Sequence, residues 1–290
     1  MYKKFICTFI CSLSLFASVI GYEYKLSIGM IFNDEAPYLK EWIEYHKLVG
    51  VEHFYLFNHH STDNYKQVLT PYISKGIVEL LDAIEQADFN GTQVDCYNRT
   101  LIKAYGKSKW VAMIDSDEFL VTPEGIKITD VLKKLDTFGG VSINWRCFGT
   151  SNVAKIPQNQ LMIENLTQCA RPEHPCNHMV KSIVRPERVR FYGGPHWPEY
   201  VAGWYSVDTD GMPYIPPTGL YKTNKLWINH YWTRDDDFLQ NIKIPRSLAW
   251  GRSKEGMLES AQELNATTDT CILRHVPKLK EIIFKENKKK

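Results

Sequence analysis

The stretch Lys109-Trp110-Val111-Ala112-Met113-Ile114-Asp115-Ser116-Asp117-Glu118-Phe119-Leu120 decides the fold. Its four apolar residues 111–114 predict a short, fully buried strand of the parallel type. Three carboxylates follow at once, on Asp115, Asp117 and Glu118. Ligands bind at the carboxyl ends of strands in open α/β sheets, and hard oxygen ligands one residue apart suit Mg²⁺ or Mn²⁺ on phosphate oxygens. The alternative is a polar turn that closes the strand, but the apolar run before it favours a metal–diphosphate site.

Strands and helices alternate regularly before this stretch. Apolar runs predict strands at 26–32, 54–57 and 77–81, and helical spacing of apolar residues predicts helices between them and again at 95–105. This alternation is typical of βαβ units. The predicted fold class is therefore α/β, with a Rossmann-like, mainly parallel mixed sheet and flanking helices.

The second half of the chain has a different character. Strands are predicted at 141–145 and 181–184, and the intervening and following segments are rich in Pro, Trp, Tyr and His. Such segments are typical of loops, which often carry binding chemistry on a rigid sheet. A last helix is expected near 233–237, where acidic residues favour a helix N-terminus. With no linker or repeat, residues 23–285 are interpreted as a single domain with halves 23–140 and 141–285.

Composition narrows the class of partner. The 290 residues carry 35 Lys and Arg against 33 Asp and Glu, a net charge of +2, and 44% of the residues are hydrophobic. Proteins that bind nucleic acid usually concentrate basic residues on one face, so nucleic acid is not an expected partner.

The N-terminus predicts export. Lys3 and Lys4 precede an uncharged run over 5–22, which is typical of a signal peptide or, if uncleaved, a signal anchor at 1–22. The expected location is secreted or periplasmic after cleavage, and membrane-associated without it. In an oxidising compartment, Cys169 and Cys176 are candidates for a local disulfide.

Several motifs recur together in a fixed order. Three are long, at Phe32-Asn33-Asp34-Glu35-Ala36-Pro37 and onward to His46, at Phe54-Tyr55-Leu56-Phe57-Asn58-His59-His60-Ser61-Thr62-Asp63, and at Trp110 to Leu120. Shorter ones are Trp145-x-x-Phe148-Gly149, His178-x-x-Lys181, Arg185-Pro186, Gly194-Pro195-His196 and His230-Tyr231. As a set spread over about residues 26 to 250, they resemble the family 92 glycosyltransferases and their bacterial relatives.

The resemblance implies a GT-A fold and a metal-dependent glycosyltransferase. Such an enzyme moves a hexose, galactose in the better-known members, from a nucleotide sugar to an acceptor hydroxyl with inversion. The implied cofactors are Mn²⁺ or Mg²⁺ and a UDP-sugar donor, and glycans, lipids and proteins are all candidate acceptors. Residues 23–140 are then the nucleotide-sugar half and 141–285 the acceptor half. One departure is Asn58, since the family usually has an Asp there that contacts the nucleotide.

Each step of the transfer has candidate residues. Asp115 and Asp117 are expected to hold the cation on the diphosphate, with His230 or His196 as a third ligand and Glu118 orienting the pair. Candidates for contacts to the nucleoside are Asn33, Glu35, Asn58, Asp63, Asn98 and Arg99. Lys243 and Arg246 are expected to close over the diphosphate, whereas Arg234 and Arg252 are interpreted as solvated surface. Glu199 is the candidate general base, ahead of Glu173 and Asp208. Trp145, Trp197 and Trp204 are candidates for stacking on sugars, although Trp145 fits the core equally well.

Two other classes fit parts of the pattern. A phosphatase of the haloacid-dehalogenase type also places Asp-x-Asp after an apolar strand, but its motif sits near the start of the domain and continues differently. An inactive, transferase-like carbohydrate-binding protein is the second alternative, because Asn58 replaces the usual Asp.

Overall fold

The computed structural model describes residues 21–214, 221–249 and 251–285. The predicted leader falls on residues 1–22 and so lies almost entirely outside the described residues. Within the described part, no helix is long and apolar enough to cross a bilayer.

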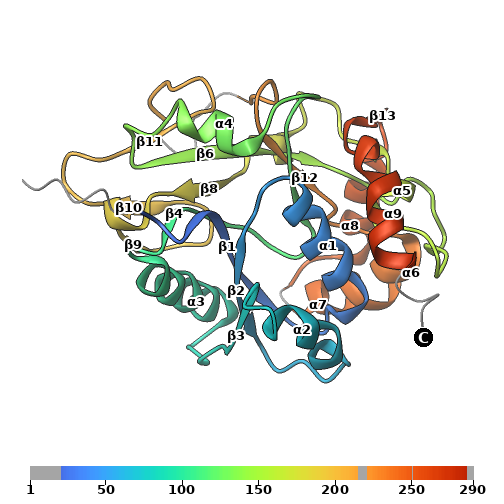
Figure 1. The fold of residues 1–290 in the computed structure, drawn as a ribbon. Helices are drawn as coiled ribbons and strands as arrows, with labels where there is room; N and C mark the ends of the chain where they lie inside the picture. The colour runs from blue at the N-terminus through green and yellow to red at the C-terminus, as the bar shows by residue number, and fades with distance from the viewer. Residues whose placement is uncertain (1–20, 215–220, 250, 286–290) are drawn as a thin grey trace, which may run out of the picture.

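A nine-stranded sheet forms the centre of the molecule (Figure 1). Along it the strands run in the order β3-β2-β1-β4-β8-β6-β12-β5, and β11 pairs with β6. The neighbours from β3 to β4 are parallel, β8 is antiparallel to both β4 and β6, and β12 is parallel to β6 and antiparallel to β5. The predicted mainly parallel mixed sheet is confirmed. The strands are β1 (Tyr24–Phe32), β2 (His53–Asn58), β3 (Val78–Asp82), β4 (Ser108–Met113), β5 (Glu118–Val121), β6 (Gly140–Cys147), β7 (Gln168–Cys169), β8 (Val180–Val184), β9 (Val189–Tyr192), β10 (Pro198–Tyr200), β11 (Ser206–Val207), β12 (Trp227–His230) and β13 (Thr267–Thr268).

Helices cover both faces of this sheet. In Figure 1, α1, α2 and α9 lie on one side of β1 and β2, and α3 lies on the other. The α-helices are α1 (Ala36–Leu48), α2 (Tyr65–Ile73), α3 (Phe89–Ala104), α4 (Ile128–Lys133), α5 (Met162–Asn165), α6 (Asp236–Phe238), α7 (Ile244–Leu248), α8 (Lys254–Glu263) and α9 (Val276–Lys285). Short 3₁₀ turns are η1 (Pro175–His178), η2 (Pro186–Arg188) and η4 (Cys271–His275), and η3 (Leu239–Lys243) is a π-helical turn.

The buried strands explain the two-sided packing. Successive side chains of a strand point to opposite faces, so Ile28 and Met30 join the cluster under α1 while Ile31 joins the cluster under α3. Gly29 permits the close approach of α3, because a Cβ at this position would lie 2.6 Å from Cγ2 of Thr100. These contacts fix the carboxyl ends of β1, β2 and β4 at one edge of the sheet.

Two expectations for the second half are wrong. The helix predicted near 233–237 begins at Asp236, with Asp235 accepting a hydrogen bond from the amide of Phe238, but it is not the last helix, since α7, α8 and α9 follow. The Cys169–Cys176 disulfide is not formed. The thiol of Cys169 on β7 lies 3.3 Å from Thr267, whereas that of Cys176 on η1 lies 3.0 Å from Nδ1 of His174, so the two thiols face different partners.

Candidate active site

The turn after β4 is built around the buried carboxylate of Glu118. The amide of Asp115 donates to Oε2 of Glu118 at 2.9 Å, and the amide of Glu118 donates to the carbonyl of Asp115 at 3.1 Å. Glu118 is fully buried, and this burial raises the pKa of its carboxyl well above the usual value. Glu118 therefore shapes the turn that presents Asp115 and Asp117.

Other elements fix the same turn from outside. Nε1 of Trp42 on α1 donates to the carbonyl of Glu118 at 2.9 Å, and the amide of Tyr231 donates to the carbonyl of Asp117 at 2.8 Å. His230 lies opposite Glu118 in the β5–β12 register. This pairing brings a histidine from the second half of the chain to the end of β4.

Asp115 is held by three side chains. Nζ of Lys181 donates to Oδ2 at 2.9 Å, and Nε2 of Gln93 and the hydroxyl of Tyr97 donate to Oδ1 at 2.8 and 3.2 Å. Lys181 is 2% exposed, and Asp115 raises its pKa well above the usual value despite the opposing effect of burial. Both oxygens of Asp115 are thus engaged within the protein.

Asp117 has a more open environment. Its carboxylate lies 3.6 Å from Nε2 of His230 and 3.9 Å from Nζ of Lys243, both longer than a hydrogen bond. Burial alone would raise the pKa of Asp117, but His230, Lys243 and Arg234 outweigh it and hold the pKa below its usual value. Burial lowers the pKa of His230 to about 4, so its imidazole is neutral at physiological pH.

Asp117 and His230 fit a divalent cation. Two ligand atoms about 2.1 Å from one ion, at angles of roughly 90–120°, are about 3.0–3.6 Å apart. The separation of Asp117 Oδ1 and His230 Nε2 falls in this range, and a neutral imidazole beside an ionised carboxylate is the required pair of donors. Both carboxylate oxygens of Asp115 already accept hydrogen bonds, from Lys181, Gln93 and Tyr97. Asp115 would therefore bind the same ion only by giving up one of these hydrogen bonds.

A cavity of about 440 Å³ opens over this turn. It lies at the carboxyl ends of β1 and β4, where an open α/β sheet binds ligands. Its lining combines carboxylates with basic side chains from the segment after β12. The lining residues include Asn33, Glu35, His59, Phe89, Gln93, Asp115, Asp117, Arg234, Lys243 and Arg246.

Arg234 was expected at the solvated surface, and this is wrong. It is 1% exposed, pairs with Glu35, and its guanidinium lies 3.7 Å from the ring centre of Tyr38 and 4.3 Å from that of Phe238. A planar guanidinium can stack on two aromatic rings while it pairs with a carboxylate. These contacts account for the burial of Arg234. Its backbone φ of 50° is left-handed, and no sequence pattern signals that turn. Arg252, in contrast, is exposed as expected.

Lys243 and Arg246 both line the cavity. They are the two residues predicted to contact the diphosphate. Lys243 ends the π-helical turn η3 and faces Asp117, and a guanidinium nitrogen of Arg246 on α7 lies 3.3 Å from Oδ1 of Asn33. Burial lowers the pKa of Lys243. The segment after β12 therefore lays two basic groups opposite the carboxylates of the β4 turn.

The four nucleoside candidates near β1 and β2 divide into two pairs. Asn33 and Glu35 line the cavity. Asn58 and Asp63 do not, because their side chains fix the backbone: Asn58 accepts from the amide of Ser61, and Asp63 accepts from the amide of Ala36 at the start of α1. Sequence reasoning missed His59 and Phe89, whose side chains do line it.

Asn98 and Arg99 are not brought to this cavity. Asn98 exchanges two hydrogen bonds with the backbone of Tyr192, and Arg99 donates to the carbonyl of Asp82. Both side chains therefore tie α3 to neighbouring strands. Their position on the helix before β4 could not reveal which of its faces they occupy.

Glu199 and His196 are also outside the lining of the cavity. Glu199 is exposed on β10, which pairs with β9 rather than with the main sheet. Nδ1 of His196 lies 3.0 Å from the carbonyl of Val180, and its ring packs on Trp145 at 5.5 Å. The ring centre of Trp145 also lies 4.2 Å from that of His230. Trp145 therefore has a packing role beside His230, and stacking on a sugar stays a prediction.

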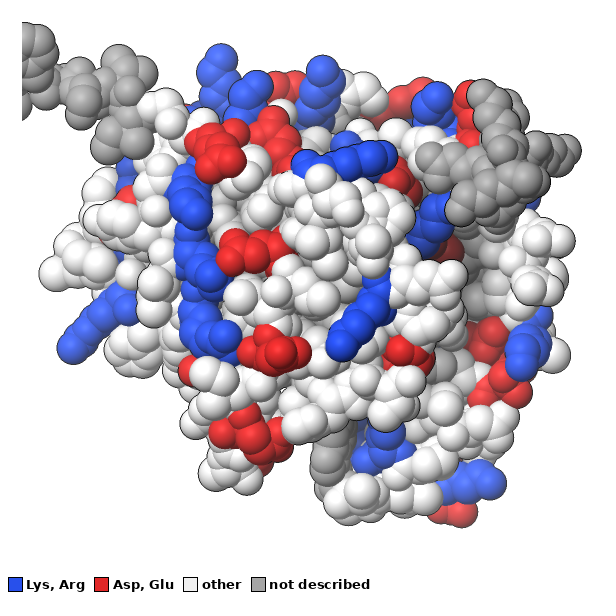
Figure 2. Space-filling view, turned by 60° about the horizontal axis from the view of Figure 1, so that its bottom comes forward, with Lys and Arg blue, Asp and Glu red and all other residues white. Residues whose placement is uncertain are grey.

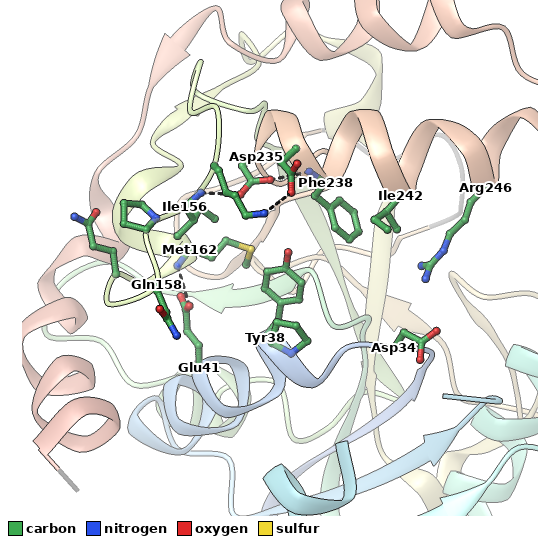
Figure 3. Close-up of a pocket in the computed structure, with 15 residues that line it drawn as sticks. Asp34, Tyr38, Glu41, Ile156, Gln158, Met162, Asp235, Phe238, Ile242 and Arg246 are labelled. Carbon is green, nitrogen blue, oxygen red and sulfur yellow. Dashed lines mark hydrogen bonds and ion pairs between the residues drawn. The ribbon is translucent and has the colours of Figure 1, made fainter. Parts of the chain in front are cut away.

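A second, larger cavity of about 610 Å³ is lined by Tyr38 and Phe238, the two rings on which Arg234 stacks (Figure 3). Tyr38 and Phe238 project into it, and Glu41 lies at its base with Arg246 and Asp34 at the opposite end. Phe238 and Arg246 line both cavities. Asp115 and Asp117 line only the smaller cavity, so that one contains the candidate active site.

Figure 2 shows a face on which basic side chains follow one another in a column at the left, with acidic side chains beside them. Basic and acidic side chains are interspersed there and separated by broad uncharged areas. The basic groups of the candidate site line the cavity itself, namely Lys243, Arg246 and the buried Arg234.

Sequence comparisons now identify the class. Residues 23–214 match the family described as Glycosyltransferase family 92. A family 92 glycosyltransferase of Arabidopsis thaliana is 26% identical over 187 residues, which cover 58% of this chain and 30% of the relative. A galactan beta-1,4-galactosyltransferase of the same plant is 28% identical over 129 residues, covering 42% and 25%. The crystal structure of glucosyl-3-phosphoglycerate synthase from Mycobacterium tuberculosis, in complex with Mn²⁺ and UDP, is 18% identical, covers 57% of this chain and 58% of that chain, and has a TM-score of 0.34.

The chain belongs to glycosyltransferase family 92. The resemblance stated from its motifs is confirmed, and this membership speaks against the haloacid-dehalogenase alternative. The chain spans less than a third of the length of the curated relatives it matches.

Proposed function

We propose that this protein transfers a hexose, galactose being the first candidate, from a UDP-sugar to a hydroxyl of a glycan acceptor. The observation that carries the proposal is the cavity at the end of β4, where Asp115 and Asp117 face Lys243 and Arg246. A diphosphate needs both a cation site and fixed positive charge, and this cavity offers both. Family membership and the galactosyltransferase relative support the choice of reaction.

The basic residues act on the leaving diphosphate. Its negative charge grows as the bond to the sugar breaks, and Lys243 and Arg246 lie at the wall where this charge would develop. Arg234 lines the same cavity, adds its positive charge there and holds Glu35 in place. Because these groups come from one segment after β12, they are positioned together and need no rearrangement at the moment of reaction.

Asp117 and His230 would hold Mn²⁺ or Mg²⁺, with Asp115 beside them. Such an ion supplies Lewis-acid stabilisation to the diphosphate oxygens. Lys181 holds the side chain of Asp115 in place, and Glu118 fixes the backbone between the two aspartates. On the other side of the cavity, Phe89 and His59 offer ring faces to a nucleobase.

Inversion of the anomeric centre is part of the proposal and rests on the family resemblance alone. Inversion needs a base on the acceptor side, and Glu199 stays a prediction that its exposed position on β10 does not support. The acceptor would approach past Trp145, whose ring packs on the ring of His230 beside Asp117.

The test is calorimetric binding of a panel of UDP- and GDP-sugars, with and without Mn²⁺, followed by a transfer assay. Metal-dependent binding of one UDP-sugar by the wild type, lost in Asp117→Ala, is the expected result. Asp237→Ala is the matched control, because Asp237 is an exposed aspartate that pairs with Lys155 away from the carboxylates of the cavity.

Two outcomes would contradict the proposal. If no nucleotide sugar binds, the inactive carbohydrate-binding alternative takes its place, and glycan binding without nucleotide would then be measured. If binding persists equally in Asp117→Ala, the nucleotide occupies a different cavity from the one described. Hydrolysis of a simple phosphate monoester would revive the phosphatase reading.

A further inference from the structure

Two neighbouring histidines and a glutamate meet at the rim of the candidate active site. Nε2 of His59 lies 3.0 Å and Nε2 of His60 lies 2.9 Å from the same oxygen, Oε2 of Glu85. The three ligand atoms all lie within 4.8 Å of one another. His59 and His60 follow β2, and Glu85 lies between β3 and α3, so the cluster joins two loops at the carboxyl end of the sheet.

The backbone is shaped to make this meeting possible. Side chains of consecutive residues in an extended chain point to opposite sides, so two adjacent imidazoles do not ordinarily reach one oxygen. His60 has a φ of 56°, a left-handed conformation that turns its ring to the side of His59. Oδ1 of Asn58 accepts from the amide of Ser61 and closes the turn around it.

His59 is the fixed member of the cluster. Its amide donates to the carbonyl of Phe32 at 2.8 Å, and its carbonyl accepts from Nδ2 of Asn33 at 2.7 Å, so its backbone is tied to the end of β1. Its ring packs on Phe89 at 5.6 Å, and its side chain is 17% exposed. A ligand held in this way loses little further freedom when a metal ion binds.

We propose that His59, His60 and Glu85 form a site for a borderline divalent cation, Zn²⁺ before Ni²⁺ or Co²⁺. Two imidazole nitrogens and one carboxylate oxygen suit these ions, whereas the oxygen-rich pair Asp115 and Asp117 suits Mg²⁺ or Mn²⁺. Tetrahedral zinc with ligands at about 2.0–2.2 Å separates them by about 3.3–3.5 Å, close to the separations of the two Nε2 atoms from Oε2.

The fourth position of the ion is left to water or an anion. Because His59 also lines the 440 Å³ cavity, the ion would sit at the edge of that cavity and tie the loop after β2 to the loop after β3. Binding of the ion itself depends on these three side chains and not on the proposed transfer reaction.

The test is a zinc titration of the full chain carrying Asp117→Ala and His230→Asn and prepared without a histidine tag, so that the Asp117–His230 pair cannot take up the ion. We expect one equivalent of Zn²⁺ to bind, and binding to weaken about 10- to 100-fold in His60→Gly and in Glu85→Gln. His60→Gly is chosen because glycine accepts the left-handed backbone, so the turn is preserved. His178→Ala, which removes an exposed histidine elsewhere, is the control and should leave the affinity unchanged.

Cobalt absorption supplies the second readout. A visible band without the near-ultraviolet charge-transfer band of a thiolate is expected, which separates this site from Cys176 and its neighbour His174. Absence of saturable binding would overturn the proposal, as would a thiolate band or an affinity unchanged in both variants. Circular dichroism of each variant shows whether the fold is retained. Nucleotide binding plays no part in these readouts, so failure of the proposed function would leave the result standing.

Discussion

Oδ1 of Asp117 and Nε2 of His230 face each other at 3.6 Å, although 113 positions separate the two residues in the chain. The contact arises because β5 and β12 pair antiparallel, which places His230 opposite Glu118, next to Asp117. The histidine ring is buried and neutral, and burial lowers its pKa to about 4. The site therefore joins a carboxylate from the first half to an imidazole from the second.

Replacement of His230 should weaken metal binding. We expect His230→Asn to lower the affinity for Mn²⁺ about 10- to 100-fold, because one donor atom of the pair is lost. Electron paramagnetic resonance of free Mn²⁺ measures this directly. His196→Asn is the control and should change little, since Nδ1 of His196 is engaged by the carbonyl of Val180. A larger effect of His196→Asn would instead make His196 the third ligand.

The two aspartates of the turn should differ in their contribution to stability. Asp115→Asn leaves the buried ammonium of Lys181 without its ion-pair partner, which we expect to cost about 2–3 kcal/mol and lower Tm by roughly 5–10 °C. Asp117→Asn removes a charge whose basic neighbours His230 and Lys243 lie at 3.6 and 3.9 Å, beyond hydrogen-bond distance, so it should lower Tm by less than Asp115→Asn does. Calorimetry without added metal checks both. Equal losses would show that Lys181 finds another partner.

The buried pair Arg234 and Glu35 allows a double-mutant cycle. Arg234→Met should destabilise the protein by about 3 kcal/mol, because the buried carboxylate of Glu35 loses its guanidinium partner. Glu35→Gln alone leaves the buried guanidinium of Arg234 without its carboxylate partner. The double variant Arg234→Met with Glu35→Gln removes both charges and should recover part of the lost stability. Urea unfolding gives the four free energies. Simple additivity would contradict a direct coupling of the pair.

Stability should fall on acidification through His46. This residue is fully buried, its Nδ1 lies 2.9 Å from the carbonyl of Trp42, and burial lowers its pKa from 6.5 to about 3. Between these values the unfolded chain binds the proton and the folded chain does not, so stability is present above about pH 6.5 and is lost as the pH falls. At about pH 4.5 this loss is on the order of 3 kcal/mol.

The variant His46→Leu isolates that contribution. It should be less stable than the wild type at neutral pH, because the amide of Leu120 loses its acceptor at His46 Nε2, but its stability should depend less on pH. Urea midpoints at neutral pH and at about pH 4.5 give the comparison. An unchanged pH dependence would assign the acid sensitivity to other groups, such as His275, whose pKa is also lowered to about 4.

Gly29 tests the packing of α3 on the sheet. Gly29→Ala places a methyl group 2.6 Å from Cγ2 and 2.8 Å from Oγ1 of Thr100, so we expect a loss of about 1–3 kcal/mol. Gly194→Ala is the control, since a Cβ there meets nothing within 4 Å. Thermal unfolding of both variants decides the point, and a neutral Gly29→Ala would mean that α3 can move outward at little cost.

The first half of the fold was predictable because its signals are local. Continuous apolar runs at β1, β2 and β4 alternate with helical spacing, and the carboxylates after β4 mark the end of a strand. The order of strands beyond β4 was not predictable, since β8 enters the sheet between β4 and β6 through long-range antiparallel pairing. Hydrophobic pattern indicates that a segment is a strand but not which neighbour it pairs with.

Part of the cavity lining was predictable, whereas the roles of its residues stay predictions. Asp115, Asp117, Lys243 and Arg246 line one cavity, and His230 contacts Asp117, as the motifs suggested. Lys181 and Arg234 were not assigned roles, because a basic residue in a sequence is more often at the surface and only the fold shows that these two are buried beside carboxylates. Asn58 and Asp63 illustrate the converse, since polar residues after strands also serve to fix turns.

The π-helical turn η3 has a consequence for helical register. An α-helix advances about 100° per residue, and a π turn contains one residue more than the α turn it replaces. Pro245 follows η3 and has no amide hydrogen to continue the α pattern. A π turn therefore accommodates one extra residue while the helical segments on either side of it keep their orientation. In this chain the extra residue is absorbed just where the two basic side chains begin, since Lys243 ends η3 and Arg246 lies on α7 directly after it.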